Sequence, residues 1–106
     1  MTDDQMNDKQ ILKDRANKYG PAKRCFETWS TMCEILNEYA KESGNVNLPH
    51  LYALKMNLLK IVRSAWNPNI EDNYKDGRNY LTIAHQCTEN TERGNKWKNI
   101  IHFQNE

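Results

Sequence analysis

The sequence has no long hydrophobic run, which excludes the simplest kinds of membrane protein. No stretch approaches the roughly 20 consecutive apolar residues that a helix needs to cross a bilayer, so we expect no transmembrane segment. The polar start, MTDDQMNDKQ, lacks the hydrophobic segment of a signal peptide. We therefore expect a cytoplasmic protein.

Cysteine is scarce and is not spaced for cross-linking or for zinc. The three cysteines, Cys25, Cys33 and Cys87, are odd in number and form no C-x-x-C pair, which argues against a disulfide framework and against a zinc ribbon. Cys25 and Cys33 fall on the apolar side of a predicted helix, where a free thiol packs as a small hydrophobic group. A metal site that combines a thiol with histidine is the alternative.

Neither sign of charge dominates. With 15 basic and 14 acidic side chains the net charge is +1, so we expect no extended nucleic-acid surface. Apolar residues make up 38% of the chain and charged residues 27%, with only four glycines and three prolines, a balance typical of a folded helical protein. A chain of 106 residues can bury one small core.

Four segments have apolar residues at the three- and four-residue spacing of an amphipathic helix. We predict helices over residues 2–19, from Pro21, as first helical residue, to Ser43, from Pro49 to the break at Asn67-Pro68-Asn69, and from Asn69, as N-cap, toward Gly94. The predicted fold is all-α: a four-helix, bundle-like domain over residues 1–93 and a C-terminal docking tail over 94–106. A homo-oligomer is expected, because the third helix and the Tyr80–Ile83 ridge offer more apolar surface than one small bundle can cover.

Acidic side chains on the second and fourth predicted helices, with basic side chains on the third helix between them, suggest a ligand-binding or catalytic site. The G-x-x-x-x-G-K-[ST], G-x-G-x-x-G, H-E-x-x-H and G-x-S-x-G motifs are all absent. Clustered carboxylates hold Mg²⁺ by oxygen contacts, and Lys and Arg meet phosphates, so such a set suits a nucleoside phosphate. A solvated bundle surface shows similar opposed charges and is the alternative interpretation.

Four segments resemble an uncharacterised family of small helical phage and prophage proteins. They are RANKYG at 15–20, FETW at 26–29, ALKMNLLKIVR at 53–63 and DNYKDGRNYLTIA at 72–84. The last two are also distantly similar to the MazG-like and dimeric dUTPase-type nucleotide pyrophosphohydrolases, which bind Mg²⁺ through E-E-x-x-E and E-x-x-D helices. No paired glutamates precede Glu34 and Glu38, and Asn73 replaces a metal-binding glutamate, so Asp76 is the one matching ligand.

The resemblance implies a small phage-type protein that binds a nucleotide or a phosphate-bearing small molecule, with little or no catalysis, in the cytoplasm of the host cell. Two alternatives are an anti-defence inhibitor that acts by binding a host protein and a divergent Mg²⁺-dependent pyrophosphohydrolase. No cofactor is required, and Mg²⁺ is the ion that the acids would hold. The expected ligand-binding residues are Lys55, Lys60, Arg63, Asp72, Asn73, Asp76 and Tyr80, and the expected metal ligands are Asp76, Glu34 and Glu38.

Overall fold

The computed structural model describes residues 3–89, with side chains described from residue 7 onward. This part of the chain forms four helices and no strand: α1 (Asp3–Tyr19), α2 (Ala22–Ser43), α3 (Leu48–Trp66) and α4 (Glu71–Gln86). The all-α, four-helix prediction is confirmed. The predicted tail, residues 94–106, lies outside the described residues.

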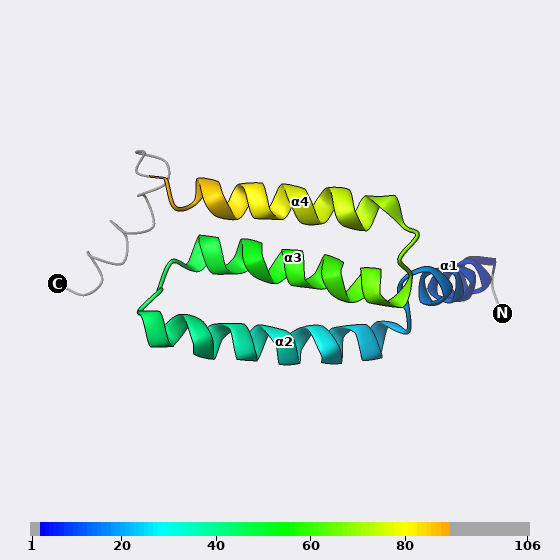
Figure 1. The fold of residues 1–106 in the computed structure, drawn as a ribbon. Coiled ribbons are helices and arrows are strands. Elements are labelled where there is room, and N and C mark those ends of the chain that lie inside the picture. Colours follow the sequence, from blue (N-terminus) through cyan, green and yellow to red (C-terminus); the bar gives the residue numbers. More distant parts are fainter. Residues whose placement is uncertain (1–2, 90–106) are drawn as a thin grey trace.

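Three of the helices lie side by side in one layer. Figure 1 shows α3 between α2 and α4, with successive helices antiparallel, and α1 set beyond one end of the layer. The contact between α3 and α4 is the most extensive, and α1 touches both α2 and α3. Because α3 has a neighbour on each side, it is the helix around which the fold is arranged.

The end of α2 and the start of α3 lie within one residue of the predicted positions, whereas Pro21 is the N-cap of α2 and not its first helical residue, because its ψ of 127° is extended. Gly44 ends α2 in the left-handed conformation at φ 76°, and its backbone N–H donates to the carbonyls of Ala40 and Lys41. The side chain of Asn47 caps α3 by accepting a hydrogen bond from the backbone N–H of His50 at 3.1 Å. Pro49 lies in the first turn of α3, where a missing N–H costs no intrahelical bond.

The start of α4 differs from the prediction. Asn69 is not the N-cap, because Ile70 occupies that position and its side chain makes no capping bond. The neighbouring Asn67 instead accepts a hydrogen bond from the backbone N–H of Asn69 at 3.1 Å, which closes the turn between α3 and α4. The acids Glu71 and Asp72 do lie in the first turn of α4, where the helix dipole favours negative charge.

The core is small and contains few large side chains. Within residues 7–89, no large side chain is fully buried, and several large apolar side chains are exposed on each of the helices. A single layer of three helices has two broad faces, and the exposed apolar side chains of the described residues lie along these helices. The buried apolar residues are Cys25, Ala40, Leu51, Ala53, Leu59 and Ala84.

Gly77 brings α4 close to α3. A methyl group added at Gly77 would lie 3.3 Å from the Asn57 amide nitrogen and 3.6 Å from Cβ of Lys60. Because the two helices are close here, the Asn57 amide donates a hydrogen bond to the Gly77 carbonyl at 2.8 Å. None of the four described helices has both the length and the apolar character that a membrane crossing requires.

Candidate functional site

The helices α3 and α4 are joined by one ion pair. Nζ of Lys60 lies 3.1 Å from Oδ2 of Asp76, with the Lys60 side chain 15% exposed and the Asp76 side chain 45% exposed. Both residues are expected ligand-binding residues, and the structure brings them together. Each neutralises the other, so neither presents a free charge to a ligand.

Arg63 follows Lys60 by one helical turn and faces α1. Its guanidinium carbon lies 4.9 Å from the centre of the Tyr19 ring, a cation–π arrangement. Its Nε is buried and has no hydrogen-bond partner within the described part of the chain. No carboxylate of residues 7–89 forms an ion pair with Arg63, so its charge is not neutralised as that of Lys60 is.

Arg63 shares a pocket with a second arginine. A cavity of about 320 Å³ lies between the end of α1, the start of α2 and α3, and its lining contains Arg15, Tyr19, Phe26 and Arg63 but no acidic residue. The remaining lining residues are small or apolar: Leu12, Ala16, Gly20, Ala22 and Cys25. Two guanidinium groups beside apolar and aromatic walls suit an anion that carries an apolar or planar portion.

The wall of this pocket depends on Gly20. Gly20 has a φ of 89°, a left-handed conformation that glycine adopts without strain. A Cβ at this position would lie 2.9 Å from Cδ2 of the Trp66 ring, so the α1–α2 turn packs directly on the indole. The element RANKYG thus places Tyr19 against Arg63, and Arg15 in the same pocket, next to a turn whose backbone conformation favours glycine.

Lys55 belongs to a different pocket, on the other side of α3 from Asp76. A shallow cavity of about 380 Å³ is lined by Glu34, Glu38, Lys41 and Lys55, together with residues of the α2–α3 loop. Nζ of Lys55 lies 4.8 Å from the centre of the Tyr52 ring. The backbone carbonyl of Lys55 accepts a 2.6 Å hydrogen bond from the Trp29 indole, which fixes α2 against α3.

The three expected metal ligands lie on two different helices. Glu34 and Glu38 are on α2 and Asp76 is on α4, and Figure 1 shows α3 between those helices. Glu38 pairs with Lys41 at 3.3 Å, and Asp76 pairs with Lys60. Within the described residues, no three His, Cys, Asp or Glu side chains gather in a way that could hold a metal ion.

The remaining expected ligand residues all lie on α4 but differ in accessibility. Asn73 is only 3% exposed, and its amide nitrogen has no hydrogen-bond partner within the described part of the chain. Asp72 is exposed in the first turn of α4, and Tyr80 is half-buried. Asp72 and Tyr80 lie one turn to either side of Asp76, which places them along the same ridge.

Cys33 is the residue in this region whose ionisation is altered. Burial raises the pKa of the Cys33 thiol above its ordinary value of 9.0, and the positive charge of Lys55 partly opposes this shift. A thiol with a raised pKa is a weak nucleophile at neutral pH, since the thiolate is the reactive form. This agrees with the expectation that Cys33 packs as a small hydrophobic group.

One comparison with known proteins identifies a family. The model of the domain of unknown function DUF6378 matches residues 5–88, which cover α1 almost entirely and all of α2, α3 and α4. The chain belongs to the DUF6378 family. No curated protein and no solved structure matches it. The DUF6378 match includes both arginines of the 320 Å³ pocket and the Lys60–Asp76 pair.

Two residues of the arginine pocket were missed as site residues. Arg15 and Tyr19 lie in the RANKYG element, which carried part of the family resemblance but was given no function. The signal that could have found them is an arginine and a tyrosine four residues apart, directly before a Gly-Pro turn. Such spacing places both side chains on one face at the end of a helix, where the next element folds back.

Proposed function

We propose that this DUF6378 protein binds a nucleotide or another phosphate-bearing small molecule and carries out little or no catalysis. The observation that carries the proposal is the pairing of Arg15 and Arg63 in one acid-free pocket. Guanidinium groups bind phosphate oxygens through paired N–H donors, and the pocket volume of about 320 Å³ suits a small ligand. Arg63 is one of the ligand-binding residues expected from the sequence, and Arg15 is a further residue of the same pocket.

The surroundings of Arg63 favour a ligand over a structural ion pair. An arginine that only stabilises a fold normally pairs with a carboxylate, as Lys60 does with Asp76. Arg63 instead rests on the Tyr19 ring, which leaves N–H groups of the guanidinium for another acceptor. Tyr19 and Phe26 supply aromatic surface in the same pocket, on which a nucleobase or sugar could pack.

Little catalysis is expected because the acids are not gathered. Mg²⁺-dependent hydrolysis of a nucleoside triphosphate needs several carboxylates around the metal. In the described part of the chain no such group exists, and Asp76 is paired with Lys60. We therefore favour binding over the divergent pyrophosphohydrolase, with the phage-type origin and host-cytoplasm location that the sequence resemblance implies.

The anti-defence alternative and a homo-oligomer are both supported by exposed apolar surface. Large side chains such as Ile35, Tyr39 and Trp66 are more than half exposed, which is unusual for a protein that works alone. A host protein or a second copy of the chain could cover them. Inhibition of a host protein is therefore the second candidate function.

Titration calorimetry of the full-length protein tests the proposal. The ligands would be inorganic phosphate, deoxynucleoside monophosphates and deoxynucleoside triphosphates, each with and without Mg²⁺. Arg63→Ala should weaken binding of the best ligand at least about tenfold, and Arg63→Lys should lie between parent and Arg63→Ala because lysine keeps the charge but loses the paired donors.

The matched control is Arg78→Ala, which removes an exposed arginine of α4 that lines none of the pockets described above. It should leave the dissociation constant unchanged. A native mass spectrum of freshly purified protein would report any retained ligand directly. Absence of binding for all three ligand classes, or equal losses for Arg63→Ala and Arg78→Ala, would contradict the proposal.

A further inference from the structure

We propose that one face of the α2–α3–α4 layer is covered by a second copy of the chain. This surface, here named the uncharged face, is made of one stripe of four residues from each helix. Within each stripe the residues are three or four positions apart, so they lie on one side of their helix. The residues are Thr28, Met32, Ile35 and Tyr39 of α2, Leu54, Asn57, Ile61 and Ala65 of α3, and Ile70, Tyr74, Gly77 and Leu81 at the start of and along α4.

The contacts between helices place the three stripes on the same side of the layer. Thr28 and Met32 of α2 line one groove of about 410 Å³ together with Ile61 and Ala65 of α3, and Arg24 is the charged residue of its lining. The stripes of α3 and α4 meet where the Asn57 amide donates to the carbonyl of Gly77 at 2.8 Å. The uncharged face is therefore continuous across all three helices.

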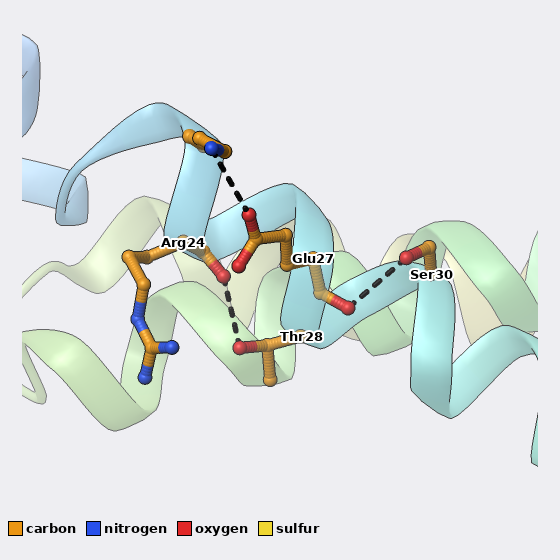
Figure 2. A network of polar contacts seen from close by, with 5 residues as sticks. Arg24, Glu27, Thr28 and Ser30 are labelled. Carbon is orange, nitrogen blue, oxygen red and sulfur yellow. Dashed lines mark hydrogen bonds and ion pairs between the residues drawn. The ribbon is translucent and has the colours of Figure 1, made fainter.

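None of the twelve positions carries a charge, although 27% of the chain is charged. Their polar groups also bond within the chain. The Thr28 hydroxyl donates to the carbonyl of Arg24 at 2.9 Å, as Figure 2 shows, and the Tyr74 hydroxyl donates to the carbonyl of Pro68 at 2.7 Å. The Asn57 amide is likewise used by Gly77, so these positions offer few free polar groups to a partner. Charge lies at the edge of the face, with Arg24 in the groove beside Thr28 and three glutamates beside Ile35 and Tyr39.

The large side chains of the uncharged face are open to solvent in the single chain. Ile35, Tyr39, Ile61, Tyr74 and Leu81 are between 44% and 74% exposed. Contiguous apolar surface of this kind normally marks an interface. The opposite side of the layer, which carries the Lys60–Asp76 pair, is less apolar. Its ridge on α4 contains the charged Asp76 as well as Tyr80 and Ile83.

The ends of the α2 stripe point to a second copy as the occupant. Arg24 precedes Thr28 by one turn and Glu42 follows Tyr39 by one turn, and neither forms an ion pair within residues 7–89. In Figure 2 the Arg24 guanidinium extends away from the helix with no contact drawn to it. A twofold axis that sets α2 antiparallel to its copy would place Arg24 opposite Glu42 of the other chain, twice.

This interface differs from the one expected from the sequence, which used the Tyr80–Ile83 ridge. That ridge follows Asp76 along α4, so it lies on the side of the layer that carries the ion pair to Lys60. Arg63 follows Lys60 by one turn on that same side. The Arg15–Arg63 pocket adjoins the groove of the uncharged face, since Tyr19, Gly20 and Cys25 line both. The two proposals are tested by different variants and different measurements, so they can fail independently.

Sedimentation equilibrium of the full-length protein, from nanomolar to micromolar concentration, tests the inference. We expect a dimer, and Ile61→Lys at the centre of the uncharged face should raise its dissociation constant at least about 30-fold. The matched control is Ile83→Lys, an equally exposed isoleucine on the other side of the layer, which should leave the constant unchanged. Circular dichroism and a melting curve establish that each variant is folded.

A charge exchange at the rim gives a second, less disruptive test. Arg24→Glu and Glu42→Arg should each raise the dissociation constant about tenfold, because the twofold axis repeats each pair. The double variant should restore the parent value. A monomer of 12.5 kDa at micromolar concentration would overturn the proposal. The occupant of the face would then be the C-terminal tail or a different protein. A dimer insensitive to Ile61→Lys, or a double variant as weak as the single ones, would overturn the proposal as well.

Discussion

Lys60 and Asp76 form an ion pair at 3.1 Å that joins α3 to α4, and the two partners differ in exposure, with Lys60 the more buried. The pair lies beside Gly77, where an added Cβ would lie 3.6 Å from Cβ of Lys60. Removal of the acid would leave the Lys60 ammonium in a mostly buried place without its counter-charge. Loss of one partner of a buried pair costs more than loss of a surface pair.

We therefore expect Asp76→Asn to lower the free energy of unfolding by about 1 kcal/mol, measured by urea denaturation at pH 7. Glu38→Gln is the matched control. It breaks the Glu38–Lys41 pair, whose atoms lie at a similar 3.3 Å but whose side chains are both 74% exposed. That change should have no measurable effect, and an equal loss from both variants would show that burial of Lys60 is unimportant.

The same Asp76→Asn variant separates binding from catalysis. If the parent protein releases pyrophosphate from nucleoside triphosphates in a Mg²⁺-dependent reaction, and Asp76→Asn abolishes it without a change in melting temperature, Asp76 is a metal ligand and not a structural partner. We expect no such turnover in the parent, and a lower melting temperature in the variant.

Gly20 and Gly44 allow the cost of packing to be separated from the cost of backbone conformation. Both have a positive φ, 89° and 76°, but a Cβ at Gly20 would meet the Trp66 ring at 2.9 Å whereas one at Gly44 would meet nothing within 4 Å. Gly44→Ala should cost about 1 kcal/mol for its conformation alone. Gly20→Ala should cost at least about 1 kcal/mol more, because the indole must also move.

The Gly20→Ala substitution should also affect ligand binding, since Gly20 lines the pocket of Arg15 and Arg63. Urea denaturation followed by Trp fluorescence measures the stability of both variants, and calorimetry measures affinity for the best phosphate ligand. If the two alanine variants are equally destabilised, the contact between Gly20 and Trp66 contributes nothing.

The Cys33 thiol gives a prediction about pH. Its pKa is raised in the folded protein by burial, so the native state keeps the thiol proton at a pH where the unfolded chain has lost it. The stability that this provides is fully present below the ordinary pKa of 9.0 and is lost as the pH rises through the higher native value. Between pH 9 and 11 the parent should therefore lose more stability than Cys33→Ala.

Other groups also titrate in this range, so the comparison is the difference between the two proteins at each pH. Lys55→Met supplies a second arm, because the Lys55 charge lowers the thiol pKa and its removal should raise that pKa further. The rate of Cys33 alkylation between pH 7 and 10 reports the titration directly. A Cys33 that reacts as fast at pH 8 as an exposed peptide thiol would contradict the prediction.

The helices were predictable because their signals are local. Pro21, Gly44 and Pro49 fix the backbone of their own turn, so the ends of α2 and the start of α3 follow from the sequence. The start of α4 was predicted wrongly because Asn67 and Asn69 are both good turn residues. The sequence does not show which of the two asparagine side chains forms a hydrogen bond with the backbone of the turn.

The site was predictable only in part because it is assembled from distant residues. Periodicity places Lys60 and Asp76 on facing sides of neighbouring helices, and they do pair. It contains no information on where α1 lies, so the contact of Tyr19 with Arg63 could not be inferred. The spacing of apolar residues also does not predict that the helices form a single layer. A helix with a wide apolar face fits either a closed bundle or a layer with an uncovered face.

Asn47 connects two distant points of the fold, and its two functions can be tested separately. Its side-chain oxygen accepts a hydrogen bond from the N–H of His50 at 3.1 Å, which caps α3, and its amide nitrogen donates to the carbonyl of Cys87 at 3.0 Å, at the end of α4. It is one of the few buried polar residues of the described chain.

Replacement of Asn47 by aspartate keeps the cap and removes the donor, whereas alanine removes both. Asn47→Asp should cost about 1–2 kcal/mol, because the Cys87 carbonyl loses its partner and meets a carboxylate oxygen instead. Asn47→Ala should cost about 2–3 kcal/mol, the sum of a lost cap and an unpaired buried carbonyl.

Amide hydrogen exchange locates each loss. Asn47→Asp should speed exchange at the end of α4 alone, and Asn47→Ala should speed it there and in the first turn of α3. If Asn47→Asp leaves exchange at Ala84 and Cys87 unchanged, the bond to Cys87 does not hold α4 in place.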